Sequence, residues 1–475
     1  MTSAYSYKPD RQSLPSQEGK AVTLEEILTA RDSRAVRQQN MQAQGGVLIS
    51  LTLAIAGAVK RNPMFDAIFA MAQQAIAQLV GMSLAYSVSV DAAGHHALWL
   101  VEGDAADWKQ KMMTLEMQSP IARLWDIDVI AHDGHALSRT DFSMPSRRCL
   151  LCDDDAKVCA RERRHTIEDL HADIKRRYWL SQQANAIGER MRQALVSEAT
   201  LTPKAGLVDA VGNGGHHDMT LTLFLDSATA IAPYLADCAA RGMTFAGMKA
   251  SPAMLDAVRP IGLAAEEAMY VTTRGINTHK GAIFAFGIFA AALGKVMAEA
   301  GRAGLDSVLS VVCTICSELV TEMNAGESAG QRAYSLYGIG GARAEAASGF
   351  ATVVQHALPH YWHEQGADRN ERRALLVVLV ALYAHNNDTT TIARVGIEGL
   401  RAHQHWARAL LQERCVLDDE NRLAMQLAVY ARECALHRLS AGGSADLLAL
   451  TIFIGRHFSA EAITTADNPF FHPLI

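Results

Sequence analysis

The sequence lacks the features that mark secreted proteins and nucleic-acid-binding proteins. It has 8 cysteines in 475 residues, too few for the disulfide framework of a small secreted domain. Residues 1–20 are polar and contain no apolar signal region. Basic residues are not in excess, because 44 Lys and Arg face 50 Asp and Glu and the formal net charge is −6. We therefore expect a cytoplasmic protein that does not bind nucleic acid.

Long hydrophobic runs are also absent. The longest, such as 281–294 and 374–384, are shorter than the roughly 18–20 residues that a helix needs to cross a bilayer. We interpret them as buried helices and expect no contact with a membrane. The hydrophobic content of 49% is ample for buried cores, and the length predicts two to four domains.

The composition of the chain changes near residue 180. Before that point, β-branched or alternating patterns predict short strands, and helical periodicity appears in two stretches. The predicted strands are 47–59, 84–90, 97–102 and 125–131. The predicted helices are 22–44 and 64–80.

From Ala184 onward, Ala, Leu, Glu, Arg and Met dominate with helical periodicity, and strand patterns almost vanish. The predicted fold class is therefore multidomain, with an N-terminal mixed α/β (α+β) domain followed by a larger all-α domain. Residues 1–20 would be a polar N-terminal segment, for which disorder is one interpretation. The two domains would be 21–180 and 185–475, and no Pro-, Gly- or Ser-rich linker separates them.

One stretch of the second half combines charge, glycine and turn residues at unusual density. It runs from Pro203 to Met219 and includes Gly214 and Gly215. These glycines would let the backbone approach a ligand closely, and a helix starting near Asp218 would direct its unpaired amides to the same place. Such an arrangement is suited to binding phosphate.

Similar turns recur four times, each before a helical stretch. They are 274–281, 338–343, 385–390 and 441–446, the last containing Gly442 and Gly443. If all five helix starts converge, their positive ends would suit a polyanion together with Lys204, Lys280, Arg343 and Arg394. Asp209, Asp218 and Asp388 would suit its magnesium. The alternative is five ordinary helix caps, because Asn, Asp, Ser and Gly are also the residues that caps use.

A pair of carboxylates marks the last predicted strand of the first half. Asp126 and Asp128 are two residues apart, so on a strand both would project from one face. Two carboxylates about 4 Å apart repel by roughly 4 kcal/mol at an effective dielectric of 20. A magnesium ion would relieve this repulsion and could bridge a triphosphate. The alternative is a solvated strand end.

Basic residues recur in two other segments of the first half. Arg31, Arg34 and Arg37 are three residues apart and would share one helix face, where they could bind phosphates or be solvated. A second group extends from Lys157 to Arg177 and includes Arg161. This group could bind triphosphate or an acidic carrier protein, or it could be a charged helix face balanced by neighbouring acids.

Four potential zinc ligands lie close together in the sequence. Cys149 and Cys152 form a CxxC pair, and Cys159 and His165 follow. The run is compact for a single ion. A reduced cluster without metal explains the same residues, so both interpretations stay open.

The second half resembles the triphosphoribosyl-dephospho-CoA synthases. The matching motifs are PKAGLVD, HHDM, GINTHKGA, YGIGGARAEAASGF, NDTTTIARVG and SAGGSADLLALT, in this order from about residue 185 to the C-terminus. The resemblance implies transfer of the triphosphoribosyl group of ATP to the 2′-hydroxyl of 3′-dephospho-CoA, with release of adenine.

The first half resembles the holo-citrate lyase synthases, also called apo-citrate lyase phosphoribosyl-dephospho-CoA transferases. The matching segments are 30–39, 123–129 and 148–152, with Cys159, Arg161, Arg163 and His165. The resemblance implies transfer of the product of the second half to a serine of the apo acyl carrier (gamma) subunit of citrate lyase, with release of diphosphate. The chain would then be a bifunctional transferase, with two consecutive enzymes fused.

These resemblances and the patterns together give a set of candidate site residues. The candidate catalytic residues are Asp126, Asp128, Asp209, Asp218, Glu266 and His279, of which the first four would hold Mg²⁺. The candidate substrate-binding residues are Arg31, Arg34, Arg37, Arg123, Arg161, Lys204, Gly214, Gly215, His217, Lys280, Arg343, Asp388, Arg394, Gly442 and Gly443. The alternative function is an ATP-consuming ribosyl hydrolase fused to a carrier-binding module without catalysis.

Overall fold

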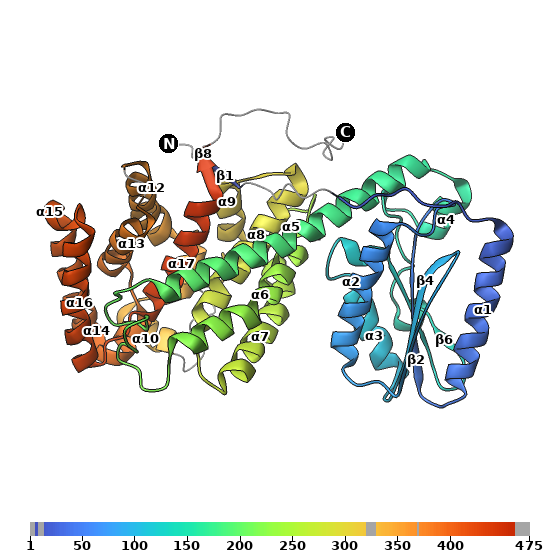
Figure 1. The fold of residues 1–475 in the computed structure, drawn as a ribbon, viewed down its shortest axis with the longest axis horizontal. Coiled ribbons are helices and arrows are strands. Elements are labelled where there is room, and N and C mark those ends of the chain that lie inside the picture. Colours follow the sequence, from blue (N-terminus) through green and yellow to red (C-terminus); the bar gives the residue numbers. More distant parts are fainter. Residues whose placement is uncertain (1–4, 8–13, 320–328, 368–369, 461–475) are drawn as a thin grey trace. The chain divides into compact units, whose positions relative to one another are not determined.

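The computed structural model describes residues 5–7, 14–319, 329–367 and 370–460. The chain divides into two compact units, whose helices and strands are labelled in Figure 1. The N-terminal unit comprises residues 10–183, and the helical unit comprises residues 1–9 and 184–475. The division falls inside one continuous helix, α5 (Ile167–Thr200).

The N-terminal unit contains a five-stranded antiparallel sheet of order β3-β4-β2-β5-β6. Its strands are β2 (Val47–Leu53), β3 (Ala85–Asp91), β4 (Gly94–Val101), β5 (Trp125–Ile130) and β6 (Ala136–Leu137). The predicted strand 47–59 is too long. The chain leaves the sheet after Leu53, and the backbone turns at Gly57, whose φ is +85°.

Helices cover both faces of this sheet (Figure 1). α1 (Leu24–Gln42) lies on one face, and α2 (Pro63–Val80) and α3 (Ala105–Leu115) pack on the other. The α2 side holds the main core, in which Ile49 and Ile127 of the sheet pack with Phe65 of α2. The α1 side has only a small apolar cluster around Met41 and Leu48, so part of that sheet face remains polar.

The starts of these helices follow from local sequence. The side chain of Thr23 accepts a hydrogen bond from the Glu26 amide, and the Glu26 carboxylate accepts one from the Thr23 amide, which forms a capping box at α1. Asn62 caps α2, and Pro63 occupies its first position. The remaining elements of this unit are the 3₁₀ turns η1 (Ile121–Leu124) and η2 (Thr140–Phe142), α4 (Ala156–Glu162) and the first part of α5.

The helical unit is built around apolar helices. Nearly all of α13 (Glu371–His385) is buried, and α17 (Gly442–His457) and α8 (Lys280–Ala300) are buried along most of their length. Other helices are α6 (Leu221–Met243), α7 (Pro252–Thr273), α9 (Leu305–Ile315), α10 (Ala329–Tyr337), α11 (Gly341–Ala347), α12 (Leu358–Ala367), α14 (Thr389–Gln412), α15 (Arg414–Leu417) and α16 (Glu420–His437). A π-helical turn, η4 (Val353–Ala357), precedes α12.

Close packing of α6 against α8 depends on glycine. A Cβ atom at Gly242 would lie 2.0 Å from the carbonyl oxygen of Ala291, and one at Gly294 would lie 2.1 Å from that of Ala239. Because neither backbone can withdraw without moving a whole helix, only glycine fits at these two crossings.

α8 is longer than its apolar run suggested. It extends over 21 residues and is, by length and composition, the one helix of the described residues that could cross a membrane. Most of it is buried inside the helical unit, as is usual for the core helix of a soluble protein.

The helical unit is not purely helical. β1 (Tyr5–Tyr7) pairs antiparallel with both β7 (Ala303–Gly304) and β8 (Phe458–Ala460). The all-α prediction was therefore incomplete, and part of the predicted polar segment 1–20 forms a strand. A three-residue strand whose partners lie hundreds of residues away leaves no periodic pattern in the sequence.

Candidate functional sites

The five turns predicted from the sequence contribute to one cavity of the helical unit. The cavity has a volume of about 460 Å³. Each turn supplies lining residues: His216 and Met219 from the first, 277–281 from the second, 341–342 from the third, 386–390 from the fourth and 442–446, except Ser444, from the fifth. The helix starts thus face a shared space instead of lying on separate surfaces.

Two of these helix starts are joined by one carboxylate. Asp388 is 2% exposed and precedes α14, where its Oδ1 accepts hydrogen bonds from the amides of Thr390 (2.9 Å) and Thr391 (3.1 Å). Its Oδ2 accepts bonds from the amide (2.8 Å) and the hydroxyl (3.1 Å) of Ser444 in the first turn of α17. Burial raises the pKa of Asp388, and these hydrogen bonds oppose that rise.

Three cations line the cavity, and each has a protein partner. The Lys204 ammonium is buried and lies 2.6 Å from Glu198 Oε1. The Lys280 ammonium lies 2.7 Å from Glu266 Oε2, but half of its side chain is exposed. The Arg394 guanidinium is exposed and lies 3.2 Å from His216 Nδ1. Lys280 and Arg394 are therefore the cations that a ligand in the cavity can reach most easily.

His279 lies at the start of α8 with its ring buried in the cavity wall. Its Nδ1 is 2.8 Å from the hydroxyl of Ser227, which in turn accepts a hydrogen bond from Thr278. Its Nε2 is buried and has no hydrogen-bond partner among the described residues. Burial, with a further contribution from the charge of Lys204, lowers the pKa of His279 to about 3. The ring is therefore neutral at pH 7.

The structure adds acidic residues that the sequence patterns did not single out. Asp446, Glu198 and Glu345 line the same cavity. The pKa of Asp446 is raised well above its usual value, first because the surrounding protein restricts its hydration and then because Asp388 and Glu198 carry like charges nearby. The motif SAGGSADLLALT contains Asp446, but only the folded chain places its carboxylate beside Gly281.

A polar site lies on the α1 face of the N-terminal sheet. Asp126 and Asp128 are both exposed on this face, while the residues between and beside them point into the core. The pKa of Asp128 is raised, first by restricted hydration and then by the charge of Asp126. The charges of Asp91 and Asp126 act on Arg34 of α1, and Arg37 lies 3.8 Å from Asp91.

A second cavity, of about 470 Å³, lies beside this site and is lined by four arginines. We call it the arginine cavity, and its cationic residues are Arg123, Arg139, Arg147 and Arg148. Arg147 also lies 3.3 Å from Asp126 Oδ1, which connects the cavity to the carboxylate pair. Of these arginines, only Arg123 is among the candidate site residues named from the sequence.

Comparison with known proteins assigns both units. Residues 184–464 match the family CitG, ATP:dephospho-CoA triphosphoribosyl transferase, and residues 22–179 match the family CitX, apo-citrate lyase phosphoribosyl-dephospho-CoA transferase. A protein CitXG of Haemophilus influenzae is 37% identical over 454 residues, which cover 92% of this chain and 97% of that protein. The chain belongs to the CitXG family.

Two further relatives agree with this membership. A protein CitXG of Leuconostoc mesenteroides subsp. cremoris is 30% identical over 467 residues, covering 92% of this chain and 98% of its own. A 2-(5''-triphosphoribosyl)-3'-dephosphocoenzyme-A synthase of Haemophilus ducreyi is 39% identical over 325 residues, covering 64% of this chain and 98% of its own. A CitXG-family chain is a bifunctional transferase, so the alternative of a hydrolase fused to a binding module is not favoured.

Several predicted site residues of this CitXG-family chain lie within the described residues but do not line the cavity of the helical unit. Asp209 binds backbone instead, accepting hydrogen bonds from the amides of Lys204 (2.9 Å), Val211 (2.8 Å) and Gly212 (2.9 Å). The carboxylate therefore closes a turn. The other predicted residues outside the lining are Gly214, Gly215, His217, Asp218, Glu266 and Arg343.

The glycines of the first turn have a packing role. A Cβ atom at Gly214, whose φ is +58°, would lie 2.8 Å from the carbonyl oxygen of Leu207, and one at Gly215 would lie 3.0 Å from Arg438 Cα. They therefore serve close contact between backbone segments. α6 also starts later than predicted, at Leu221 after the cap residue Thr220, which leaves Asp218 exposed in the preceding loop.

The remaining predicted arginines of the N-terminal unit differ in how exposed they are. Arg31 is exposed on α1, and Arg161 is exposed in the last turn of α4. Arg34 and Arg37 are partly buried against the sheet. The structure thus places two of the three α1 arginines near the carboxylate face.

Proposed function

We propose that the helical unit uses its cavity to transfer the triphosphoribosyl group of ATP to the 2′-hydroxyl of 3′-dephospho-CoA, releasing adenine. The N-terminal unit then transfers the product to a serine of the apo acyl carrier subunit of citrate lyase, releasing diphosphate. The observation that carries the first assignment is the convergence of five turns and three cations on one cavity in a chain of this family.

The triphosphate is assigned to the open side of that cavity. Lys280 and Arg394 are the accessible cations, and the first turns of α8 and α17 line the same space, where the positive ends of the two helices favour an anion. Glu266 holds Lys280 in place before the ligand binds. Lys204 is less available, because its ammonium is buried against Glu198.

The carboxylates of the cavity fit a magnesium ion. Asp446 is the best candidate ligand, because the four donors that bind Asp388 already use both of that carboxylate's oxygens. Restricted hydration and the like charges of Asp388 and Glu198 raise the pKa of Asp446, so a cation beside it would be stabilised. Carboxylate oxygens are also the ligands that Mg²⁺ prefers. The ion would supply charge neutralisation for the triphosphate. Asp209 is not proposed for this role.

His279 is proposed to contact the substrate through Nε2. Thr278 donates to Ser227, so the Ser227 hydroxyl is free to donate to Nδ1 and the ring proton is left on Nε2. A neutral ring can then donate a hydrogen bond to the bound nucleotide or coenzyme.

The second reaction is assigned to the carboxylate pair and the arginine cavity. Asp126 and Asp128 would share a magnesium ion, since the like charge of Asp126 contributes to the raised pKa of Asp128. Arg123 and Arg147 border the same region and would bind the triphosphate of the incoming group. The serine hydroxyl of the carrier attacks a phosphorus, a new phosphodiester forms and diphosphate leaves.

One two-step assay tests both assignments. Purified protein is incubated with Mg²⁺, ATP and dephospho-CoA, and adenine is measured by chromatography. Apo carrier is then added and weighed by mass spectrometry. Adenine is expected only when dephospho-CoA is present, and the carrier is expected to gain the mass of the phosphoribosyl-dephospho-CoA group. Adenine release without dephospho-CoA would favour hydrolysis, and an unchanged carrier mass would remove the N-terminal assignment.

A further inference from the structure

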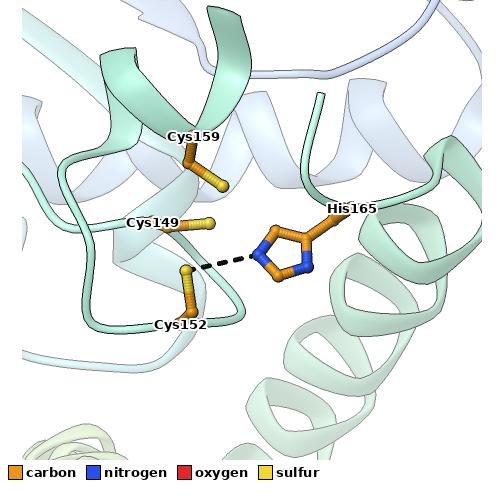
Figure 2. A group of neighbouring side chains, drawn as sticks. All are labelled: Cys149, Cys152, Cys159 and His165. Carbon is orange, nitrogen blue, oxygen red and sulfur yellow. Dashed lines mark hydrogen bonds between the residues drawn. The ribbon is translucent and has the colours of Figure 1, made fainter. Parts of the chain in front are cut away.

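Three sulfurs and one imidazole meet in the N-terminal unit, and the proposed reactions assign no role to them. The side chains of Cys149, Cys152, Cys159 and His165 point toward one another (Figure 2), and their ligand atoms all lie within 4.8 Å. His165 Nε2 lies 3.3 Å from Cys152 Sγ. Zinc–sulfur bonds of about 2.3 Å in a tetrahedron place neighbouring ligands roughly 3.5–3.8 Å apart, close to this arrangement.

The backbone around the first two cysteines forms a tight turn that presents both sulfurs on one side. The Cys149 amide donates to the carbonyl of Asp154 at 2.8 Å, and Arg148 and Asp155 form a β-bridge that closes the turn. The Leu151 amide points at Cys149 Sγ at 3.5 Å. Amides directed at a sulfur in this way favour the thiolate form, which is the form that binds metal.

The other two ligands come from separate elements. Asp155 caps α4 by accepting hydrogen bonds from the amides of Lys157 and Val158, and the helix then buries Cys159 to 4% exposure. His165 lies between α4 and α5. Folding therefore brings the four metal-binding groups together from a turn, a helix and a loop.

We propose that Cys149, Cys152, Cys159 and His165 bind one zinc ion in a closed tetrahedral site. Three thiolates and an imidazole match the softness of Zn²⁺ and exclude Mg²⁺, which requires oxygen ligands. Four protein ligands leave no open coordination position, so the ion has a structural role. The proposal adopts the zinc interpretation, one of the two that the sequence left open for these residues.

The zinc site would position the wall of the arginine cavity. Cys149 and Cys152 line that cavity beside Arg147 and Arg148. The same turn is also tied to α5, because Arg177 donates to the carbonyl of Leu150 at 3.0 Å. Losing the ion should therefore disturb carrier loading, an expectation that rests on the proposed function of the N-terminal unit.

The decisive experiment measures metal in the full-length chain. Protein purified under reducing conditions without added chelator is analysed by mass spectrometry of its metals, together with Cys152→Ser and His165→Ala. Cys415→Ser is the matched control, since Cys415 is an exposed cysteine outside the cluster. We expect about one zinc per chain in the parent and control, and loss of zinc in both cluster variants. A parent that neither contains zinc nor takes it up would overturn the proposal, as would zinc retained in both variants.

Two further measurements separate this proposal from the proposed function. Replacing zinc by Co²⁺ in the parent should give the strong visible bands of a tetrahedral site with thiolate charge transfer, even if the variants fail to fold. A weak octahedral spectrum would count against the four-ligand site. Adenine release should persist in Cys152→Ser while carrier loading falls. If the parent itself loads no carrier, the proposed function of the N-terminal unit fails, but the measured zinc content still tests whether the four residues bind zinc.

Discussion

Asp388 and Asp446 share one cavity but differ in how their charges are compensated. Asp388 accepts four hydrogen bonds that tie α14 to α17, so its role is at least partly structural. Asp446 lies near the negative charges of Asp388 and Glu198. A cation bound in the cavity would therefore receive its largest electrostatic stabilisation from Asp446.

Replacing Asp446 by Asn should lower the rate of adenine release by about 100-fold or more, as removal of a charge that stabilises the transition state does in other enzymes.

The folded-state pKa of Asp446 is raised, so its ionisation costs stability as the pH rises above the pKa that this carboxyl has in the unfolded chain. Asp446→Asn should therefore gain stability relative to the parent between pH 5 and pH 8. Thermal unfolding at both pH values checks this, and the exposed Asp256→Asn is the control.

Replacing Lys280 by Met should raise KM for ATP by about tenfold or more, because a cation in contact with phosphate is worth roughly 1.5–3 kcal/mol. Lys249→Met is the matched control. Lys249 is exposed and does not line the cavity, and its replacement removes the same charge. Initial rates of adenine release at varied ATP concentrations measure the difference. Equal KM values in the two variants would contradict the assignment of Lys280.

The double substitution Asp126→Asn and Asp128→Asn should abolish carrier loading and leave adenine release intact, because the pair lies in the N-terminal unit. Asp107→Asn changes an exposed carboxylate of the same unit and should affect neither step. Carrier mass and adenine are measured in the same reaction. Simultaneous loss of both activities in the double variant would argue against independent sites.

At the scale of elements, helix starts position the cavity, and glycines set how closely they approach. A Cβ atom at Gly281, in the first turn of α8, would lie 1.9 Å from Asp446 Oδ2 in α17. The two helices can therefore bring this backbone and this carboxylate together only if residue 281 has no side chain. The sequence showed a glycine here but not which group it would meet.

Gly281→Ala should consequently reduce adenine release strongly, because the added methyl group must displace Asp446 or the start of α8. We expect a destabilisation of about 1–3 kcal/mol as well, the usual cost of overpacking. Gly262→Ala lies within α7, where nothing lies within 4 Å of the added carbon, and should stabilise the unit by up to about 1 kcal/mol. Urea unfolding and adenine release of the two variants test the contrast.

At the scale of the whole molecule, buried histidines make the helical unit sensitive to acid. Burial lowers the pKa of His403 to about 4, and that of His457 to about 4. Each ring is neutral when folded and has a pKa near 6.5 when unfolded, so the unfolded chain binds more protons between these values. Stability should therefore fall as the pH drops from 6.5 toward 4.

For each such histidine the loss should approach about 1.4 kcal/mol per pH unit in that window. His403→Gln should remove the contribution of one histidine to the slope of the free energy of unfolding against pH. His405→Gln changes an exposed position of the same helix and should leave that slope unchanged. Urea unfolding of the helical unit at pH 6.5, 5.5 and 4.5 gives the slopes. Parallel slopes for the parent and His403→Gln would show that this ring titrates normally in the folded chain.

The sequence by itself determined the features that depend on neighbouring residues. These features each depend on a few consecutive residues. They are the starts of α1 and α2, the alternation that places Asp126 and Asp128 on one face, and the spacing of the cysteines. The order of the motifs also identified both families, since motif recognition requires no contact in space.

Only the tertiary structure decided which groups meet. The sequence made Asp209 a candidate metal ligand, but neighbouring amides donate hydrogen bonds to its carboxylate. The carboxylate of Asp446 lies beside Gly281 because α17 packs against the start of α8. β1 likewise depends on strands at 303–304 and 458–460. Charge compensation and strand pairing are set by groups distant in the chain, and no local pattern encodes their distances.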